Sequence, residues 1–107
     1  MGLDFDLVLK EDADETCVHE AYITHNVAPM WRLAGIYDAL YNSNGQRVSD
    51  VVETLRAGLA KMEASPEEYL PLNPPNGWGS YESAKRWLSK LVAACDRFPI
   101  AVIESSK

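Results

Sequence analysis

The chain has 107 residues, 47% of them apolar, and a formal net charge of −6, a composition typical of one small globular domain over residues 1–107. Its 16 Asp and Glu against 10 Lys and Arg disfavour non-specific binding to nucleic acid, because that binding depends on cations that neutralise phosphates. The two cysteines, Cys17 and Cys95, lie far apart and form no CxxC pair, so neither a disulfide framework nor a zinc site is expected.

The sequence shows no basic region followed by an apolar run near residue 1, and no segment approaches about 18 apolar residues. We therefore expect a cytoplasmic protein that does not enter a membrane.

Two strands are predicted at the start of the chain. Residues 3–10 alternate polar side chains with four apolar ones, Leu3, Phe5, Leu7 and Leu9, as a half-buried strand does. The acidic residues 11–15 are expected to form a solvated hairpin loop. Residues 16–25, rich in β-branched and aromatic types, predict a second strand antiparallel to the first, with Cys17, His19, Ala21, Ile23 and His25 on one face.

Three helices and a last strand follow. The first helix is expected to begin at Asn26, its N-cap, and to end near residues 42–45; Gly35 inside it would require a closely packed neighbour. The second runs from about Ser49 to the residue before Ser65. A Pro- and Gly-rich loop, residues 71–79, precedes the third, which Ser80 caps. Residues 100–104 predict the third strand.

These elements predict an α+β fold of order ββαααβ, in which a small, mostly antiparallel sheet of three strands carries three main helices on one face. The sheet would have unpaired edges. Because an unpaired edge is a ready route to a sheet shared between chains, we expect a homo-oligomer.

The two histidines do not indicate a metal site. His19 and His25 share a strand face but lie about 20 Å apart, at roughly 3.3 Å per residue, so they cannot bind one metal together. The chain also has no GxSxG, P-loop, GxGxxG, HExxH or CxxC motif. We expect no metal, no cofactor and no catalytic residue.

The junction between the second strand and the first helix is the first candidate site. Thr24, His25 and Asn26 place donors at a helix N-terminus, which favours phosphate or carboxylate. Arg32 is expected to reach the same ligand or a neighbouring protomer. The alternative is a capped helix, with Trp31 in the core and His25 bonded to a backbone carbonyl.

The loop before the third helix is the second candidate. Trp78 lies between two glycines, and its ring and that of Tyr81 would stack a base or sugar while Ser80 holds a polar group. The alternative is that Trp78 plugs the sheet or an oligomer interface.

Three motifs carry a resemblance over nearly the whole chain: ITHN at residues 23–26, AGIYDALY at 34–41 and NPPNGWGSYE at 73–82. The chain resembles a family of small, mostly uncharacterised phage and prophage proteins, with a shorter connection after Tyr41 than that family has.

By analogy with phage proteins that sequester host immune signals, the resemblance implies a homo-oligomer that binds a small nucleotide-type ligand, ADP-ribose-derived or cyclic, without cleaving it. Two alternatives remain: a protein that inhibits a host protein through its edge strand or aromatic surface, and a nucleotide-cleaving enzyme that uses His19 or His25.

Overall fold

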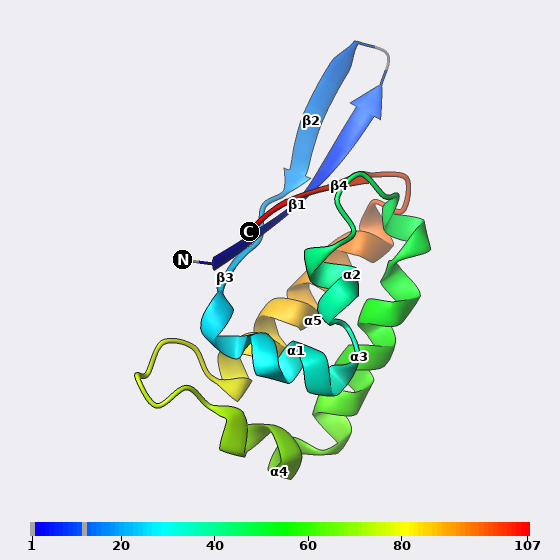
Figure 1. The fold of residues 1–107 in the computed structure, drawn as a ribbon. Helices are drawn as coiled ribbons and strands as arrows, with labels where there is room; N and C mark the ends of the chain where they lie inside the picture. Colours follow the sequence, from blue (N-terminus) through cyan, green and yellow to red (C-terminus); the bar gives the residue numbers. More distant parts are fainter. Residues whose placement is uncertain (1, 12) are drawn as a thin grey trace.

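A four-stranded antiparallel sheet is built around the first strand (Figure 1). The computed structural model describes residues 2–11 and 13–107. Its strands are β1 (Gly2–Glu11), β2 (Asp14–His19), β3 (Tyr22–Thr24) and β4 (Val102–Ser106). The predicted acidic hairpin loop includes Asp12, which lies outside the described residues.

The pairing partners of β1 fix the arrangement of the other strands. Leu7 pairs with both His19 of β2 and Ile103 of β4, and Asp4 pairs with both Tyr22 of β3 and Ser106 of β4. Because a residue pairs once on each side, β4 lies on one side of β1. Strands β2 and β3 follow one another along the opposite side.

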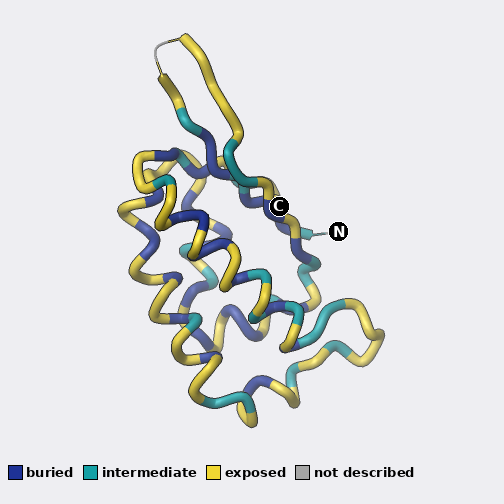
Figure 2. Tube along the Cα trace, turned by 180° about the vertical axis from the view of Figure 1, so that it is seen from behind, coloured by how far each residue is buried: buried dark blue, intermediate teal, exposed yellow. Residues whose placement is uncertain are grey.

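The predicted second strand is therefore present but interrupted. Leu7 pairs with His19 whereas Val8 pairs with Cys17, so one extra residue of the second strand forms a bulge between them. The bulge shifts the alternation, and Cys17 does not share the core-facing side of Ala21 and Ile23 as the sequence predicted. Beyond this point the β1–β2 hairpin projects past the helices (Figure 1), and residues 10–11 and 13–17 on its two strands are exposed (Figure 2).

Five α-helices complete the fold of the described residues. They are α1 (Ala28–Ala34), α2 (Tyr37–Tyr41), α3 (Val52–Ala64), α4 (Pro66–Tyr69) and α5 (Tyr81–Arg97), with the 3-10 turns η1 (His25–Val27), η2 (Val48–Asp50) and η3 (Leu70–Leu72). The helices α1, α3 and α5 lie on one side of the sheet (Figure 1), so the α+β prediction is confirmed. Ser80 caps α5 as expected, since its side chain accepts a hydrogen bond from Ser83 N at 3.1 Å.

The predicted first helix is wrong in two respects. It breaks into α1 and α2 at Gly35, whose φ of 77° is left-handed and ends α1. Its N-cap is also not Asn26, because Thr24 caps the preceding turn η1 and accepts a hydrogen bond from Asn26 N. The glycine that packs closely is Gly58 of α3, where an added Cβ would overlap the Ile36 side chain.

The core lies between the sheet and the helices. Its largest fully buried side chains come from all parts of the chain and include Trp31, Tyr81, Phe5, Leu40 and Leu88. Among the described residues, no helix is long and apolar enough to cross a membrane.

The two edges of the sheet differ in how far they are covered by other backbone. The segment 44–48 runs beside β4: Gly45 N donates to Ile103 O, and Ile103 N donates to Gln46 O, both at 2.8 Å. Asn44 Oδ1 also accepts a hydrogen bond from Ser105 N at 2.9 Å. A strand from another chain could therefore pair with the edge formed by β2 and β3 rather than with β4.

Candidate anion-binding site

A pocket of about 420 Å³ lies where η1, α1, α2 and the residue after β4 meet. The described residues that line it are His25, Ala28, Arg32, Tyr37, Tyr41 and Lys107, and none of them is acidic. Arg32 contributes a guanidinium group and Lys107 an ammonium group. On a chain with a net charge of −6, this is a local concentration of positive charge.

Four of the lining side chains lie in contact along a row, and the two tyrosine rings in it are stacked. The Tyr37 and Tyr41 rings are parallel, with centroids 4.4 Å apart and an angle of 9° between their planes. Residues four apart face the same side of a helix, which is why α2 brings the two rings together. The Arg32 guanidinium lies 4.3 Å from the Tyr37 centroid, and the His25 ring lies 5.5 Å from that of Tyr41.

A hydrogen bond holds the His25 end of this row. His25 Nδ1 and the Tyr41 hydroxyl are 2.8 Å apart. Burial raises the pKa of Tyr41, and Tyr37 adds to the rise, so the phenol stays protonated at neutral pH. When that hydroxyl donates to Nδ1, the proton of a neutral His25 ring is on Nε2, which remains a donor.

Lys107 is positioned by the C-terminal end of α2. Its Nζ donates to the Tyr41 carbonyl at 3.3 Å and to Asn42 Oδ1 at 3.1 Å. A cation is favourable there because the last carbonyls of a helix lack intrahelical partners. This contact brings Lys107, distant in sequence, beside the tyrosines of α2.

The structure places the predicted junction residues in two groups. His25 and Arg32 line the pocket. Thr24 and Asn26 instead bond to each other, since Asn26 Nδ2 donates to Thr24 Oγ1 at 2.9 Å.

The junction also lacks the long helix N-terminus that was expected to attract the anion. The α1 helix has seven residues, and Pro29 in its first turn has no N–H to offer. The positive charge at the pocket therefore comes from side-chain cations rather than from helix N–H groups.

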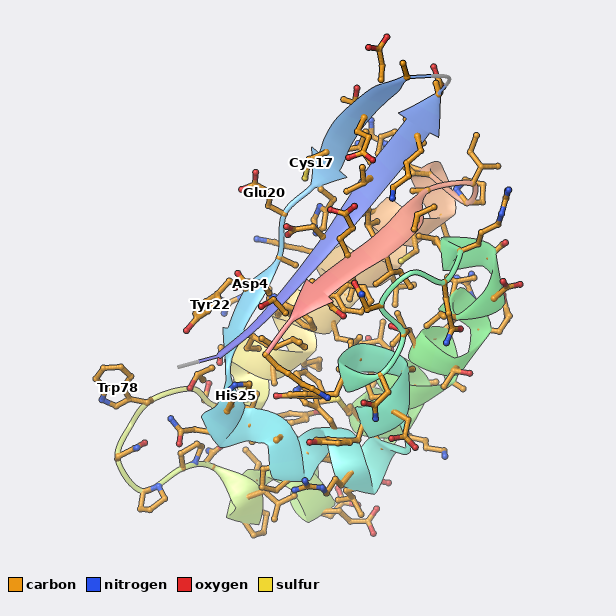
Figure 3. The ribbon with its side chains drawn as sticks, turned by 45° about the horizontal axis from the view of Figure 1, so that its top comes forward. Asp4, Cys17, Glu20, Tyr22, His25 and Trp78 are labelled. Atoms are coloured by element: carbon orange, nitrogen blue, oxygen red, sulfur yellow. The ribbon has the colours of Figure 1, made fainter. Side chains whose placement is uncertain are left out.

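The Trp78 loop lies against η1. An added Cβ on Gly79 would come within 2.9 Å of both Val27 and Thr24 side-chain carbons, so the loop backbone packs tightly there. Trp78 is 67% exposed, and its backbone N–H donates to Asn76 Oδ1 at 2.9 Å. Figure 3 shows the indole standing out from the loop at the end of the molecule where His25 lies.

Ser80 and Tyr81 serve the fold. The Ser80 side chain belongs to the capping box of α5. Tyr81 is 2% exposed and its hydroxyl donates to Met62 O at 2.6 Å, in the last turn of α3. The hydroxyl of Tyr81 and the cap of Ser80 are thus engaged within the protein, and neither residue lines the pocket.

Four residues of the pocket were not among the sequence candidates: Ala28, Tyr37, Tyr41 and Lys107. The four-residue spacing of the two tyrosines is readable in the sequence and lies within the predicted first helix. No local signal marks Lys107, because its position depends on the pairing of β4 with β1.

Other ligands find less support in the described part of the chain. It contains no group of three or more His, Cys, Asp or Glu side chains placed to hold a metal ion. Comparison of the chain with protein-family models, curated proteins and solved structures gave no match. The assignment of the pocket accordingly rests on its own geometry and charge.

Proposed function

We propose that the protein binds a small nucleotide-type ligand in the pocket around Arg32 and holds it without cleaving it. The observation that carries this proposal is the group of His25, Arg32 and Lys107 in a pocket whose described lining has no Asp or Glu side chain. Phosphate groups are the anionic part of such ligands, and hydrogen bonds from cationic donors to them are about twice as strong as neutral ones.

The exposed Trp78 supports a second contact with the same ligand. Its loop packs on η1, and η1 supplies His25, so a nucleotide with a phosphate in the pocket would reach the indole by extending past η1. Stacking of a base on an aromatic side chain contributes about 1–3 kcal/mol. A loop already held by Asn76 and Gly79 loses little conformational entropy on binding.

The resemblance to phage proteins supplies the biological part of the proposal. In that setting the protein is a homo-oligomer that sequesters a host immune nucleotide, ADP-ribose-derived or cyclic. The β2–β3 side of the sheet is where a second chain would add a strand, since segment 44–48 runs beside β4.

The test is binding followed by recovery of the ligand. The purified protein is incubated with ADP-ribose or 3′,5′-cyclic AMP, washed, and heated, and the released compound is identified by chromatography. Recovery of the intact compound supports sequestration. A cleaved product excludes sequestration and favours an enzyme that uses the hydrogen-bonded pair of His25 and Tyr41.

A pair of matched variants tests the site. Arg32→Gln is expected to weaken binding by about tenfold or more, because one charged hydrogen-bond partner of the phosphate is lost. Arg86→Gln removes the same charge from α5, away from the pocket, and should leave the affinity within about twofold. Equal losses in the two variants would mean that only overall charge matters.

A second candidate function is inhibition of a host protein, which the 67% exposure of Trp78 favours. Tryptophan is enriched among the residues that dominate binding energy at protein interfaces. In that case Trp78→Ala abolishes capture of a stoichiometric host protein, and Arg32→Gln has no effect on it.

A further inference from the structure

We propose that the pocket selects a ligand with two adjacent phosphates, a diphosphate ester, over one with a single phosphodiester such as a cyclic mononucleotide. This inference rests on the proposed function and specifies its ligand class. It follows from which ring faces and hydrogen-bond donors of the row are available to a ligand.

The faces by which the two tyrosine rings stack, and the face of Tyr37 toward Arg32, are already occupied. Tyr37 has the Tyr41 ring on one face, at 4.4 Å and 9°, and the Arg32 guanidinium 4.3 Å from its centroid. One face of the Tyr41 ring stacks on Tyr37, and the Tyr41 hydroxyl lies 2.8 Å from His25 Nδ1. A base cannot insert between the Tyr37 and Tyr41 rings without separating them. We therefore expect the pocket to bind another part of the ligand.

The pocket instead offers donors and positive charge. Among the described residues, the Arg32 guanidinium contacts the Tyr37 ring and makes no ion pair or hydrogen bond, which leaves its N–H groups for a ligand. Lys107 uses its ammonium on two oxygens and has three N–H groups. Neutral His25 has Nε2–H when Tyr41 donates to Nδ1. All three groups favour an acceptor-rich anion.

The charge of the pocket matches two phosphates better than one. Arg32 and Lys107 carry one positive charge each, and each phosphoryl group of a diphosphate diester carries one negative charge at neutral pH. A guanidinium also binds two oxygens at once, in a planar fork. A lone phosphodiester would leave one cation without a partner.

The size of the pocket agrees with this ligand class. Its volume of about 420 Å³ falls within the range of small-molecule sites, about 300–1,000 Å³, and so exceeds what inorganic phosphate needs. There is room for a diphosphate and part of an attached sugar.

Calorimetric titration of the whole chain tests the inference with four probes: ADP-ribose, 3′,5′-cyclic AMP, inorganic pyrophosphate and orthophosphate. ADP-ribose should bind at least about tenfold more tightly than cyclic AMP, as one additional charged contact implies. Pyrophosphate should displace it at about tenfold lower concentration than orthophosphate. In Arg32→Gln both differences should shrink, whereas in Arg86→Gln they should persist.

The outcomes separate the two proposals. If cyclic AMP binds as tightly as ADP-ribose, or pyrophosphate displaces it no better than orthophosphate, the diphosphate preference is wrong while nucleotide binding stands. If neither nucleotide binds, the proposed function and the inference both fail.

Discussion

At the scale of the residue, Arg32 is held by an aromatic ring and not by a carboxylate. The Tyr37 ring attracts the guanidinium without neutralising it, so the positive charge remains available to an anion. By contrast, Arg56 on α3 donates to both carboxylate oxygens of Asp96 on α5, at 2.7 and 3.0 Å. Arg56 also lowers the pKa of that carboxyl. The Arg32 guanidinium is thus available to an anionic ligand, whereas the Arg56 guanidinium is already paired with a carboxylate.

Tyr81 is the residue whose role is best separated from ligand binding. Tyr81→Phe removes the hydroxyl that donates to Met62 O and leaves that carbonyl of the last turn of α3 without this partner. We expect a loss of about 1–2 kcal/mol in the free energy of unfolding, measured by urea denaturation. Ligand affinity should not change.

Trp78→Ala is the matched control for Tyr81→Phe. Because the indole is 67% exposed, its removal should leave the free energy of unfolding nearly unchanged and weaken nucleotide binding. A Tyr81→Phe protein that is fully stable but binds poorly would return Tyr81 to the site.

At the scale of the element, two glycines have opposite roles. Gly35 separates α1 from α2 through its left-handed backbone, and only Lys61 Nζ lies near an added Cβ, at 3.5 Å. Gly58 lies inside α3 with ordinary helical neighbours, and its lack of a Cβ lets Ile36 pack against the helix. One glycine is needed for its φ and the other for its size.

Gly58→Ala tests which of two effects dominates. Helix propensity alone would stabilise α3 by about 1 kcal/mol. Overpacking against Ile36 should cost about 1–3 kcal/mol, so we expect net destabilisation in urea denaturation.

The second variant needed is Ile36→Ala, alone and combined with Gly58→Ala. If the clash is the cause, the double variant is more stable than the sum of the two single changes predicts, by about 0.5 kcal/mol or more. Additive losses would show that Ile36 is not what Gly58 accommodates.

At the scale of the whole molecule, the buried Cys95 thiol of α5 makes the stability of the fold depend on pH. Cys95 of α5 is 2% exposed, and burial raises the pKa of its thiol from 9.0 to about 11. Between those values the unfolded chain has lost a proton that the folded protein still binds. The free energy of unfolding should therefore be unaffected by this group below pH 9 and fall as pH rises from 9 to 11.

Cys95→Ala removes this group from the titration. The variant should be less stable at neutral pH, because it loses buried volume, but its free energy of unfolding should fall less steeply between pH 9 and 10.5 than that of the wild type. Urea denaturation at a series of pH values gives both slopes. Parallel curves would show that the thiol does not contribute.

Much of the fold was predictable because local patterns decide it. The alternation of apolar residues in β1 and the stripes of α3 and α5 each bury one face. Residues 16–25 and 26–42 were predicted as one strand and one helix, because neither a bulge nor a left-handed glycine changes hydrophobic periodicity enough to reveal itself.

Composition, capping and periodicity are local properties, and they sufficed to predict the α+β class, the two long helices and the candidates His25 and Arg32, which both line the pocket. The residues that surround these two side chains follow from long-range packing. Pairing of β4 with β1 brings Lys107 to α2, and the break at Gly35 sets the orientation of Tyr37 and Tyr41. Contacts between residues 66 positions apart, such as that of Lys107 with Tyr41, depend on the whole packing and leave no trace in any short stretch of sequence.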